Sequence, residues 1–347
     1  MGKTTRWVAV AAFSALSLLG TACSNGNGNS SGSDNGSGNG GGGGLTGSVV
    51  VSGSSTVQPI SSLVAEKFSS KNPDVQISVD GPGTGDGFAL FCDGKADVSD
   101  ASRPIEDTEA ATCDKNGINY VELKIGLDGI TVMTNPSNDA VTCLTKGDLY
   151  SLFGPESQGF STWAAANGLD KKLGGSGTFP NAPLDITAPG EESGTYDAFI
   201  ELVGIEAVAL SHGVAADQAA SLRPDYQSSP DDNVIIQAME GSPSSLGFVG
   251  FAYAQGAGDQ VKELQIDGGS GCTAPTFNSI ADGSYPLSRA LYVYVNTDRA
   301  SKNPALKAFI DFYMSSDGFA SVDEAGYVNL PDTDISTTQS AWSSAVG

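Results

Sequence analysis

Short runs of β-branched apolar residues alternate with amphipathic helical stretches throughout residues 45–347 of this chain. The first run is Val49–Val51, and the stretch after it has apolar residues on one helical face, at Val57, Ile60, Val64 and Phe68. Strands interleaved with helices favour an α/β fold with a mainly parallel sheet. Because the strands outnumber those of one compact sheet, the pattern predicts two α/β lobes.

Further elements are predicted along the chain by the same patterns. Strands are expected at residues 75–79, 130–133, 184–186 and 291–295. Helices with one apolar face are expected at residues 196–203 and 306–313. Asn72 and Pro73 should end the first helix, because the residue before a proline disfavours helical geometry.

Three short segments rich in glycine and hydroxyl side chains lie where a strand gives way to a turn or helix: Gly53–Thr56, Gly81–Gly87 and Glu192–Thr195. A helix N-terminus has up to four unpaired N–H donors and about half a positive charge. With nearby hydroxyls, such donors can replace the water shell of a small anion. Each segment alone is equally typical of an ordinary cap or turn. Together they predict a two-lobed receptor for a small anion.

The N-terminus has the features of an export signal. Lys3 and Arg6 precede the apolar run Trp7–Leu19, and small residues lead to Cys23. The run is shorter than the roughly 20 apolar residues of a transmembrane helix. The cysteine resembles that of a bacterial lipobox, although Gly20 stands where leucine is usual. We therefore predict a signal peptide at residues 1–22 and lipidation of Cys23, with a plain cleaved signal or a buried apolar helix as alternatives.

The stretch from Ser24 to Gly44 consists almost entirely of serine, glycine and asparagine. Having no large apolar side chain to bury, it cannot offset the entropy of becoming ordered. We expect residues 23–45 to comprise the lipidated cysteine and a flexible tether.

Composition argues against several functions. The 40 acidic and 17 basic residues give a formal net charge of −23, which is unsuited to binding nucleic acid. His212 is the only histidine, so neither a serine–histidine nucleophile nor a histidine-rich metal site is expected. Nor does the sequence contain a phosphate-binding P-loop motif. We predict that the chain is not an enzyme and that it needs no metal or cofactor.

Cysteines other than Cys23 lie at positions 92, 113, 143 and 272. An even number of cysteines in an exported chain indicates two disulfides, and four cysteines allow three pairings. We favour Cys92 with Cys113, which are close in sequence, and Cys143 with Cys272, for which the lobe assignment below gives the reason.

Eight segments occur in a distinctive order: Gly53–Val57, Gly83–Phe88, Ala101–Ile105, Asp128–Val132, Ser193–Phe199, Asp231–Val234, Gly247–Phe251 and Tyr285–Arg289. Together they closely resemble the phosphate-binding proteins of the phosphate-specific ABC importer. The resemblance covers residues 48–329, which is nearly the whole chain after the tether.

This resemblance implies a type-II periplasmic-binding-protein fold, with two α/β lobes joined by a two-strand hinge. The crossings match residues 128–133 and 288–295, which places lobe 1 at 46–128 plus 290–347 and lobe 2 at 129–289. Cys143 and Cys272 would then both lie in lobe 2, so that neither favoured disulfide would lock the hinge.

The resemblance also implies which residues contact the anion. The matching positions are Ser55, Thr56, Thr84, Ser193, Gly194 and Thr195. Two departures from the family pattern affect the site. Ser102 and Arg103 replace a segment in which many members have a proton-accepting aspartate. Pro189 and Ala188 stand where many members have an arginine, and we infer that Arg103 supplies this charge from the opposite lobe.

Glu192, or its neighbour Glu191, is the expected proton acceptor in place of that aspartate. At neutral pH phosphate carries a proton and sulfate does not, so a carboxylate can accept from one and repel the other. The alternative is that Glu192 only complements the dipole of the following helix.

By this resemblance, the protein is an extracytoplasmic phosphate receptor, held at the outer face of the cell membrane by the lipid on Cys23. Its expected partners are inorganic phosphate and the permease and ATPase subunits of an ABC importer. The alternatives are a receptor for another oxyanion, such as sulfate or molybdate, and a surface adhesin or signalling lipoprotein.

Overall fold

The structure is a computed structural model that describes residues 44–191 and 193–346. Gly44–Gly347 forms one compact unit. The predicted signal peptide, Cys23 and nearly all of the tether lie outside the described residues. Within the described part, every helix is too short or too polar to cross a bilayer.

The described strands form a nine-stranded sheet and a three-stranded sheet. The larger has the order β2-β1-β3-β12-β4-β8-β6-β7, with β9 added beside β4, and the smaller has the order β11-β10-β5. The strands are β1 (Gly47–Gly53), β2 (Val75–Asp80), β3 (Val98–Ala101), β4 (Tyr120–Thr134), β5 (Cys143–Thr145), β6 (Asp185–Ala188), β7 (Gln227–Ser228), β8 (Ser245–Gly250), β9 (Lys262–Glu263), β10 (Gln265–Asp267), β11 (Cys272–Thr273) and β12 (Ser288–Asn296).

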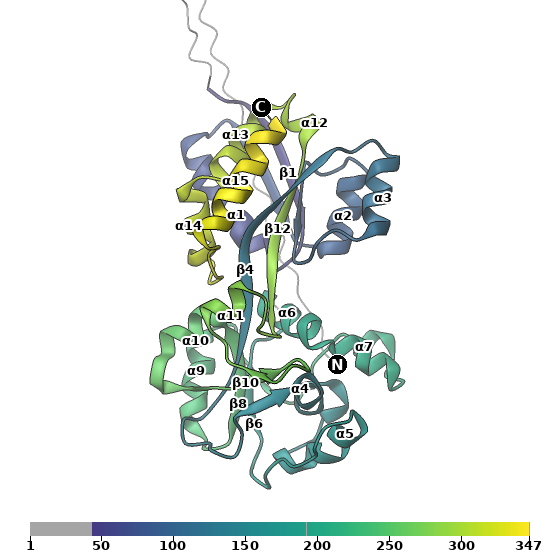
Figure 1. Ribbon diagram of the computed structural model, residues 1–347, viewed down its shortest axis with the longest axis vertical. Coiled ribbons are helices and arrows are strands. Elements are labelled where there is room, and N and C mark those ends of the chain that lie inside the picture. Colours follow the sequence, from purple (N-terminus) through teal and green to yellow (C-terminus); the bar gives the residue numbers. More distant parts are fainter. Residues whose placement is uncertain (1–43, 192, 347) are drawn as a thin grey trace, which may run out of the picture. The chain divides into compact units, whose positions relative to one another are not determined.

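Two strands connect the lobes. β4 pairs with β12 from Tyr120 to Gly129 and with β8 from Ile130 to Thr134, so one strand belongs to both halves of the sheet. In Figure 1, β4 and β12 run from the upper lobe into the lower one. The predicted two-strand connection is therefore confirmed. The prediction of a mainly parallel sheet was only partly right, because β12 and β4 pair antiparallel with each other and with their neighbours β3 and β8.

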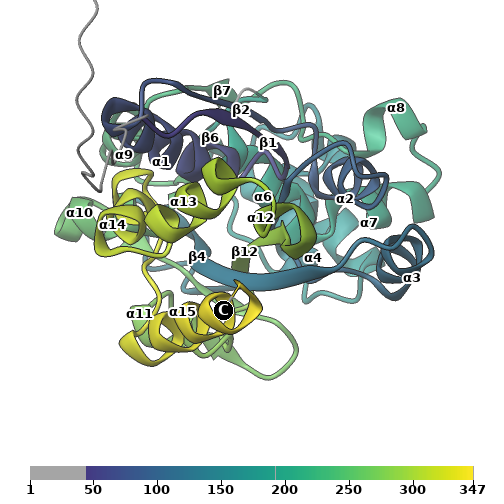
Figure 2. The same ribbon diagram turned by 90° about the horizontal axis from the view of Figure 1, so that it is seen from above.

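Helices cover both faces of the strands. Figures 1 and 2 show α1, α13 and α14 on one side of the upper lobe and α2 and α3 on the other. The α-helices are α1 (Gln58–Lys71), α2 (Thr84–Cys92), α3 (Asp107–Lys115), α4 (Lys146–Phe153), α5 (Asn167–Lys172), α6 (Gly194–Val203), α7 (Ile205–Ser211), α8 (Ala216–Ala219), α9 (Asp232–Gly241), α10 (Phe251–Ala257), α11 (Phe277–Ala281), α12 (Thr297–Ala300), α13 (Pro304–Tyr313), α14 (Ser316–Glu324) and α15 (Asp332–Val346). Short 3-10 turns occur at Pro155–Ser157, Trp163–Ala166 and Gly258–Gln260.

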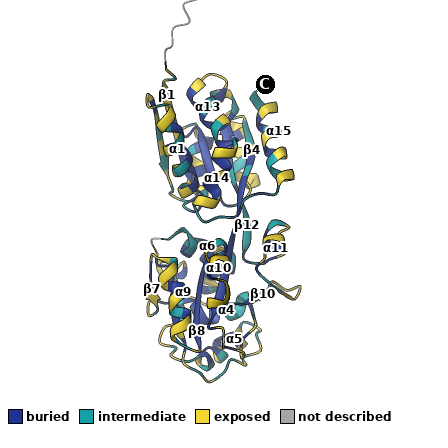
Figure 3. Ribbon diagram, turned by 90° about the vertical axis from the view of Figure 1, so that its left-hand side faces the viewer, coloured by how far each residue is buried: buried dark blue, intermediate teal, exposed yellow. Residues whose placement is uncertain are grey.

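The apolar faces predicted from the sequence point into the core. Figure 3 shows buried strands between helices whose outer faces are exposed. In α6, Phe199 stacks on Phe248 of β8 with 4.0 Å between ring centroids and meets Phe153 of α4 edge-on. Such aromatic pairs contribute about 0.5–1.5 kcal/mol each beyond the burial of their area, and here they pack α6 against β8 and α4.

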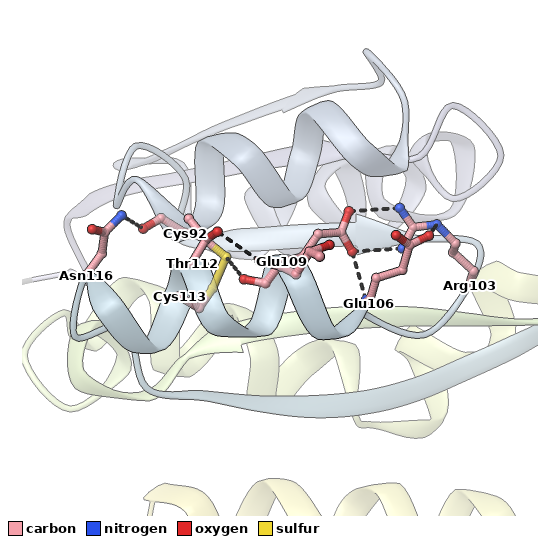
Figure 4. The surroundings of a disulfide bond; sticks show 8 residues. Cys92, Arg103, Glu106, Glu109, Thr112, Cys113 and Asn116 are labelled. Carbon is pink, nitrogen blue, oxygen red and sulfur yellow. Dashed lines mark hydrogen bonds and ion pairs between the residues drawn. A yellow bond between two sulfur atoms is a disulfide. The ribbon is translucent and has the colours of Figure 1, made fainter.

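The disulfide pairing agrees with the prediction. Cys92 bonds to Cys113 and ties α2 to α3, whereas Cys143 bonds to Cys272 and ties β5 to β11. Figure 4 shows the first bond beside the side chains of α3. Each bond therefore closes a local substructure, and neither joins β4 to β12.

Candidate functional site

The loop between β1 and α1 presents the first pair of predicted residues, Ser55 and Thr56. Its path is fixed by Ser54, whose backbone N–H donates to the Asp100 carbonyl (2.9 Å) and whose Oγ accepts from the Thr56 N–H (3.2 Å). Gly53 is required here, because a Cβ at this position would lie 2.0 Å from the Asp100 oxygen. Taken alone, Gly53–Thr56 is typical of a helix cap, but the N-cap of α1 is Val57, which makes no side-chain hydrogen bond.

The glycine-rich segment begins a helix that sequence reasoning missed. Gly83 is the N-cap of α2 at φ 114°, a conformation that favours glycine, and Thr84 is the first helical residue. The Thr84 and Ser102 hydroxyls lie 3.0 Å apart, and the Ser102 N–H donates to Thr84 Oγ1 (3.2 Å). The structure thus brings these two predicted residues together at the N-terminus of α2.

Arg103 is held by acids of its own lobe. Its Nη1 and Nη2 donate to the two carboxylate oxygens of Glu109, each at 2.8 Å, and Glu106 lies 3.5 Å from its Nε. Figure 4 shows this pair beside the Cys92–Cys113 bond. The hydrogen bonds that Arg103 donates to Glu109 raise the pKa of Arg103. Burial opposes ionisation of Glu109, but the hydrogen bonds from Arg103 and the Glu106 backbone outweigh it and lower the pKa of Glu109. Much of the charge of Arg103 is therefore neutralised locally.

The N-terminus of α6 meets the loop between β1 and α1. Ser193 is the N-cap, as predicted, and its Oγ accepts from the Thr195 N–H (3.2 Å). A Cβ on Gly194 would lie 3.4 Å from the Ser55 carbonyl oxygen and 3.5 Å from the Thr56 Cα. The two predicted anion-binding segments, which are far apart in the sequence, are therefore direct neighbours.

Arg289 connects these segments, and sequence reasoning did not assign it to the site. It lies on β12, with a side chain that is 11% exposed. It donates from Nη2 to Thr56 Oγ1 (2.9 Å), from Nε to Asp128 Oδ2 (3.2 Å) and from Nη1 to Glu201 of α6. The sequence did hold one indication of this role, because Arg289 ends Tyr285–Arg289, one of the eight segments that resemble the family. The sequence did not show that β12 brings Arg289 within hydrogen-bond distance of the β1–α1 loop.

Two carboxylates beside Arg289 are partly or fully withdrawn from water. Burial raises the pKa of Asp128, with Arg289 opposing this rise. Burial likewise raises the pKa of Asp197 on α6, although its Oδ2 accepts a hydrogen bond from Ser55 Oγ (2.8 Å) that opposes the rise. Asp197 was also missed, since its contact spans 142 positions in the sequence.

A cavity of about 700 Å³ lies beside these groups. It is bounded by residues of both lobes, among them Thr84, Ser102, Arg103, Glu201 and Arg289. Two guanidinium groups and two hydroxyl side chains thus line one cavity between the lobes, together with the carboxylates of Asp86 and Glu201. Hydrogen-bond donors of this kind suit an anion.

Of the two predicted proton acceptors, Glu191 is the one that the structure describes. Glu192 lies outside the described residues. Glu191 is exposed and lines a separate cavity of about 510 Å³, together with Arg223 and Tyr226. The structure therefore gives no support to Glu191 as a group of the interlobe cavity.

His212 lies apart from the interlobe cavity. Its Nδ1 is 2.7 Å from Glu156 Oε2, which also accepts from the Tyr150 hydroxyl. Within residues 44–191 and 193–346, no group of three or more histidine, cysteine or acidic side chains is arranged to hold a metal ion.

Comparison with known families identifies the class of this chain. Residues 30–317 match the model of the PBP superfamily domain, and the chain belongs to this superfamily. A phosphate transport receptor from Vibrio cholerae shares the fold at 24% identity, with a TM-score of 0.58 and coverage of 82% of this chain and 100% of that one. The predicted type-II periplasmic-binding-protein fold is thereby confirmed. The superfamily is one of substrate-binding receptors and not of enzymes.

Other relatives are more similar to this chain in sequence. Protein SphX of Synechocystis is 38% identical over 82% of this chain and 79% of its own length. The phosphate-binding protein PstS of Staphylococcus saprophyticus is 35% identical over 87% of this chain and 86% of its own length. The crystal structure of a possible phosphate-binding protein from Planctomyces limnophilus has a TM-score of 0.78 and 33% identity, covering 87% of this chain and 100% of that one.

Proposed function

We propose that this protein is an extracytoplasmic receptor that binds inorganic phosphate between its two lobes and delivers it to an ABC importer. The observation that carries the proposal is the convergence of the β1–α1 loop, the N-terminus of α6 and Arg289 at one place. The names of the relatives support phosphate as the anion, since PstS is a phosphate-binding protein at 35% identity.

The donors of the site suit an oxyanion. Because Arg289 donates to Thr56 Oγ1, the oxygen of that hydroxyl is engaged as an acceptor and its proton can point to the ligand. The N-termini of α2 and α6 add backbone N–H groups and positive dipole ends. We assign ligand contacts to Ser55, Thr56, Thr84, Ser102, Arg103, Ser193, Gly194 and Thr195, and we add Arg289 to this set. Glu192 remains a proposed contact.

The lobe boundaries and the membrane anchor belong to the same proposal. We place lobe 1 at 46–128 plus 290–347 and lobe 2 at 129–289, with closure about β4 and β12. The closed form would dock on the membrane permease of the importer, whose cytoplasmic ATPase subunits would drive release and import. A lipid on Cys23 would hold the protein at the outer face of the cell membrane. Labelled palmitate should enter the wild-type chain and not the Cys23→Ala variant, and equal labelling of both would contradict the anchor.

A thermal-shift comparison of oxyanions tests the proposed ligand. Purified protein freed of bound anion should show a higher Tm with phosphate and little change with sulfate or molybdate. A ligand at about 1,000 times its Kd stabilises by about 4 kcal/mol, which is readily measured. A larger shift with sulfate or molybdate would assign the site to that anion. No shift with any of the three would contradict the receptor function.

A further inference from the structure

Two places where the lobes approach each other lie near opposite ends of α6. The cavity of about 700 Å³ reaches Glu201 and Leu202, near the C-terminal end of this helix. Near its N-terminal end, α10 approaches the residues that follow α14. In both Figure 1 and Figure 2, α10 and α14 lie on the left, whereas α3 and α7 lie on the right.

The contact beside α10 joins Tyr253 to Gly326. A Cβ on Gly326 would lie 2.6 Å from Tyr253 Cε2 and 3.2 Å from its Oη. A Cβ on Gly250, the N-cap of α10, would lie 3.6 Å from the Gly326 carbonyl oxygen. The Tyr253 ring therefore packs directly on the backbone of Gly326, and no methyl group fits between them.

Gly326 is fastened to lobe 1. Its N–H donates to the Asp323 carbonyl at the end of α14 (2.9 Å). Two residues further on, Val328 exchanges backbone hydrogen bonds with Leu127 of β4, at 2.8 and 2.9 Å. This segment must therefore move together with β4 and the rest of lobe 1.

Tyr253 belongs to lobe 2 and stands outside its core. Helix α10 buries Phe251, Ala254 and Ala257, which anchor it to that lobe. The Tyr253 side chain is left 42% exposed. Because the ring adds little to the core, its removal should cost little stability.

Tyr327, the residue after Gly326, connects this contact to the proposed anion site. A Cβ on Gly194, in the first turn of α6, would lie 3.7 Å from Tyr327 Oη and 3.4 Å from the Ser55 carbonyl oxygen. Gly194 and Ser55 are both assigned to the anion. The contact between Tyr253 and Gly326 is therefore one residue away from a residue that borders the site.

We propose that the Tyr253 ring seals this end of the interlobe site when the lobes close, and that position 326 requires glycine because the ring must pack against its backbone. This inference rests on the proposed function. Exclusion of water strengthens the hydrogen bonds that hold an anion, because the effective dielectric constant falls. The seal should therefore act mainly by slowing the departure of the anion.

Tyr253→Ala should shorten the residence time of phosphate. We expect its dissociation rate constant to rise by about 10-fold, with a smaller change in the association rate constant, because changes within one site fall mostly on dissociation. A chase of bound radiolabelled phosphate with excess unlabelled phosphate measures the first rate constant, and titration gives the affinity. Phe277→Ala is the matched control, since it removes another exposed ring (45%) and should leave both values unchanged.

Gly326→Ala tests the same contact from lobe 1. Its methyl group should displace the ring and speed the release of phosphate. In the Tyr253→Ala background it should have little further effect, because the ring that it displaces is already gone. Gly213→Ala is the control for backbone strain. Gly213 has a φ of 85°, close to the 84° of Gly326, but no heavy atom of the described residues lies within 4 Å of its Cβ position.

A folded Tyr253→Ala variant that releases phosphate at the wild-type rate would overturn the inference. So would a full effect of Gly326→Ala in the Tyr253→Ala background, or an equal effect of Gly213→Ala. If Tyr253→Ala does not fold, the comparison of Gly326→Ala with Gly213→Ala provides the test. Failure of the wild type to bind phosphate would instead reject the proposed function itself.

Discussion

Asp100 is fully buried at the end of β3, and burial raises its pKa from 3.8 to about 7. Its Oδ1 accepts from Ser61 Oγ (2.9 Å), whereas Oδ2 has no hydrogen-bond partner within the described residues. Because the folded-state pKa lies above the unfolded value, the stabilisation from the protonated form is complete below about pH 3.8. It is lost as the pH rises through about 7.

Asp100→Asn should remove this pH dependence, because the amide stays neutral and can still accept from Ser61. Relative to the wild type, we expect its free energy of unfolding to be higher at pH 8 by up to about 4 kcal/mol, with little gain at pH 4. Urea unfolding at both pH values measures this difference. The exposed Asp217→Asn variant is the control, and an equal gain at both pH values would contradict the explanation.

The contributions of Arg289 and Arg103 to phosphate binding can be compared by single substitutions. Arg289 donates to groups from both lobes, whereas Arg103 is paired with Glu109 of its own lobe. Lysine keeps the charge but loses the planar fork of donors. We expect Arg289→Lys to weaken phosphate binding by about 10-fold or more, and Arg103→Lys to weaken it less. A larger loss in Arg103→Lys, measured by titration, would return the main cationic role to Arg103.

The N-terminus of α6 is the element whose cap also belongs to the proposed anion site. Aspartate caps a helix about as well as serine and suits the dipole. Ser193→Asp should therefore keep the wild-type Tm within about 1 °C, a change corresponding to roughly 0.6 kcal/mol for a unit of this size. It should nevertheless reduce phosphate affinity by about 100-fold, because the new carboxylate would lie beside the bound phosphate and repel it.

Ser193→Ala serves as the comparison, because it should change stability more than phosphate affinity. Loss of the cap should lower stability by about 1 kcal/mol, while the backbone donors of Gly194 and Thr195 remain for the anion. Phosphate binding by Ser193→Asp at the strength of the wild type would place the ligand away from α6.

Regular elements were predictable where the periodicity was strong. The apolar face of α6 at residues 196–203 and the end of α1 at Asn72 agree with the sequence. Helix α2 was missed because its first turn, Thr84–Gly87, contains two glycines and reads as a turn. The position of β3 between β1 and β12 fixes Ser102 beside Thr84, and no local pattern contains that information.

Contacts between lobes depend on the whole molecule, and they account for most of what sequence reasoning missed. Asp197 meets Ser55 and Arg289 meets Thr56 only because β4 and β12 bring the lobes together. Many family members have an arginine where this chain has Ala188 and Pro189. Arg103 was predicted to supply that positive charge, because its segment matches one that contributes to the anion site in the family. Its bidentate pair with Glu109 became visible only when α3 was placed beside it. The structure places the segments that the resemblance named close together. Their contact with the anion stays a prediction, and the pairing of charges needed the fold.

The central claim is that the two lobes form a receptor for phosphate. Its most direct test is calorimetric titration of the protein, stripped of endogenous anion, with phosphate and then sulfate near neutral pH. We predict one-to-one binding of phosphate in the micromolar range or tighter, a free energy of about −8 kcal/mol or more favourable, and no heat of binding with sulfate. Absence of phosphate binding, or equal binding of sulfate, would contradict the account.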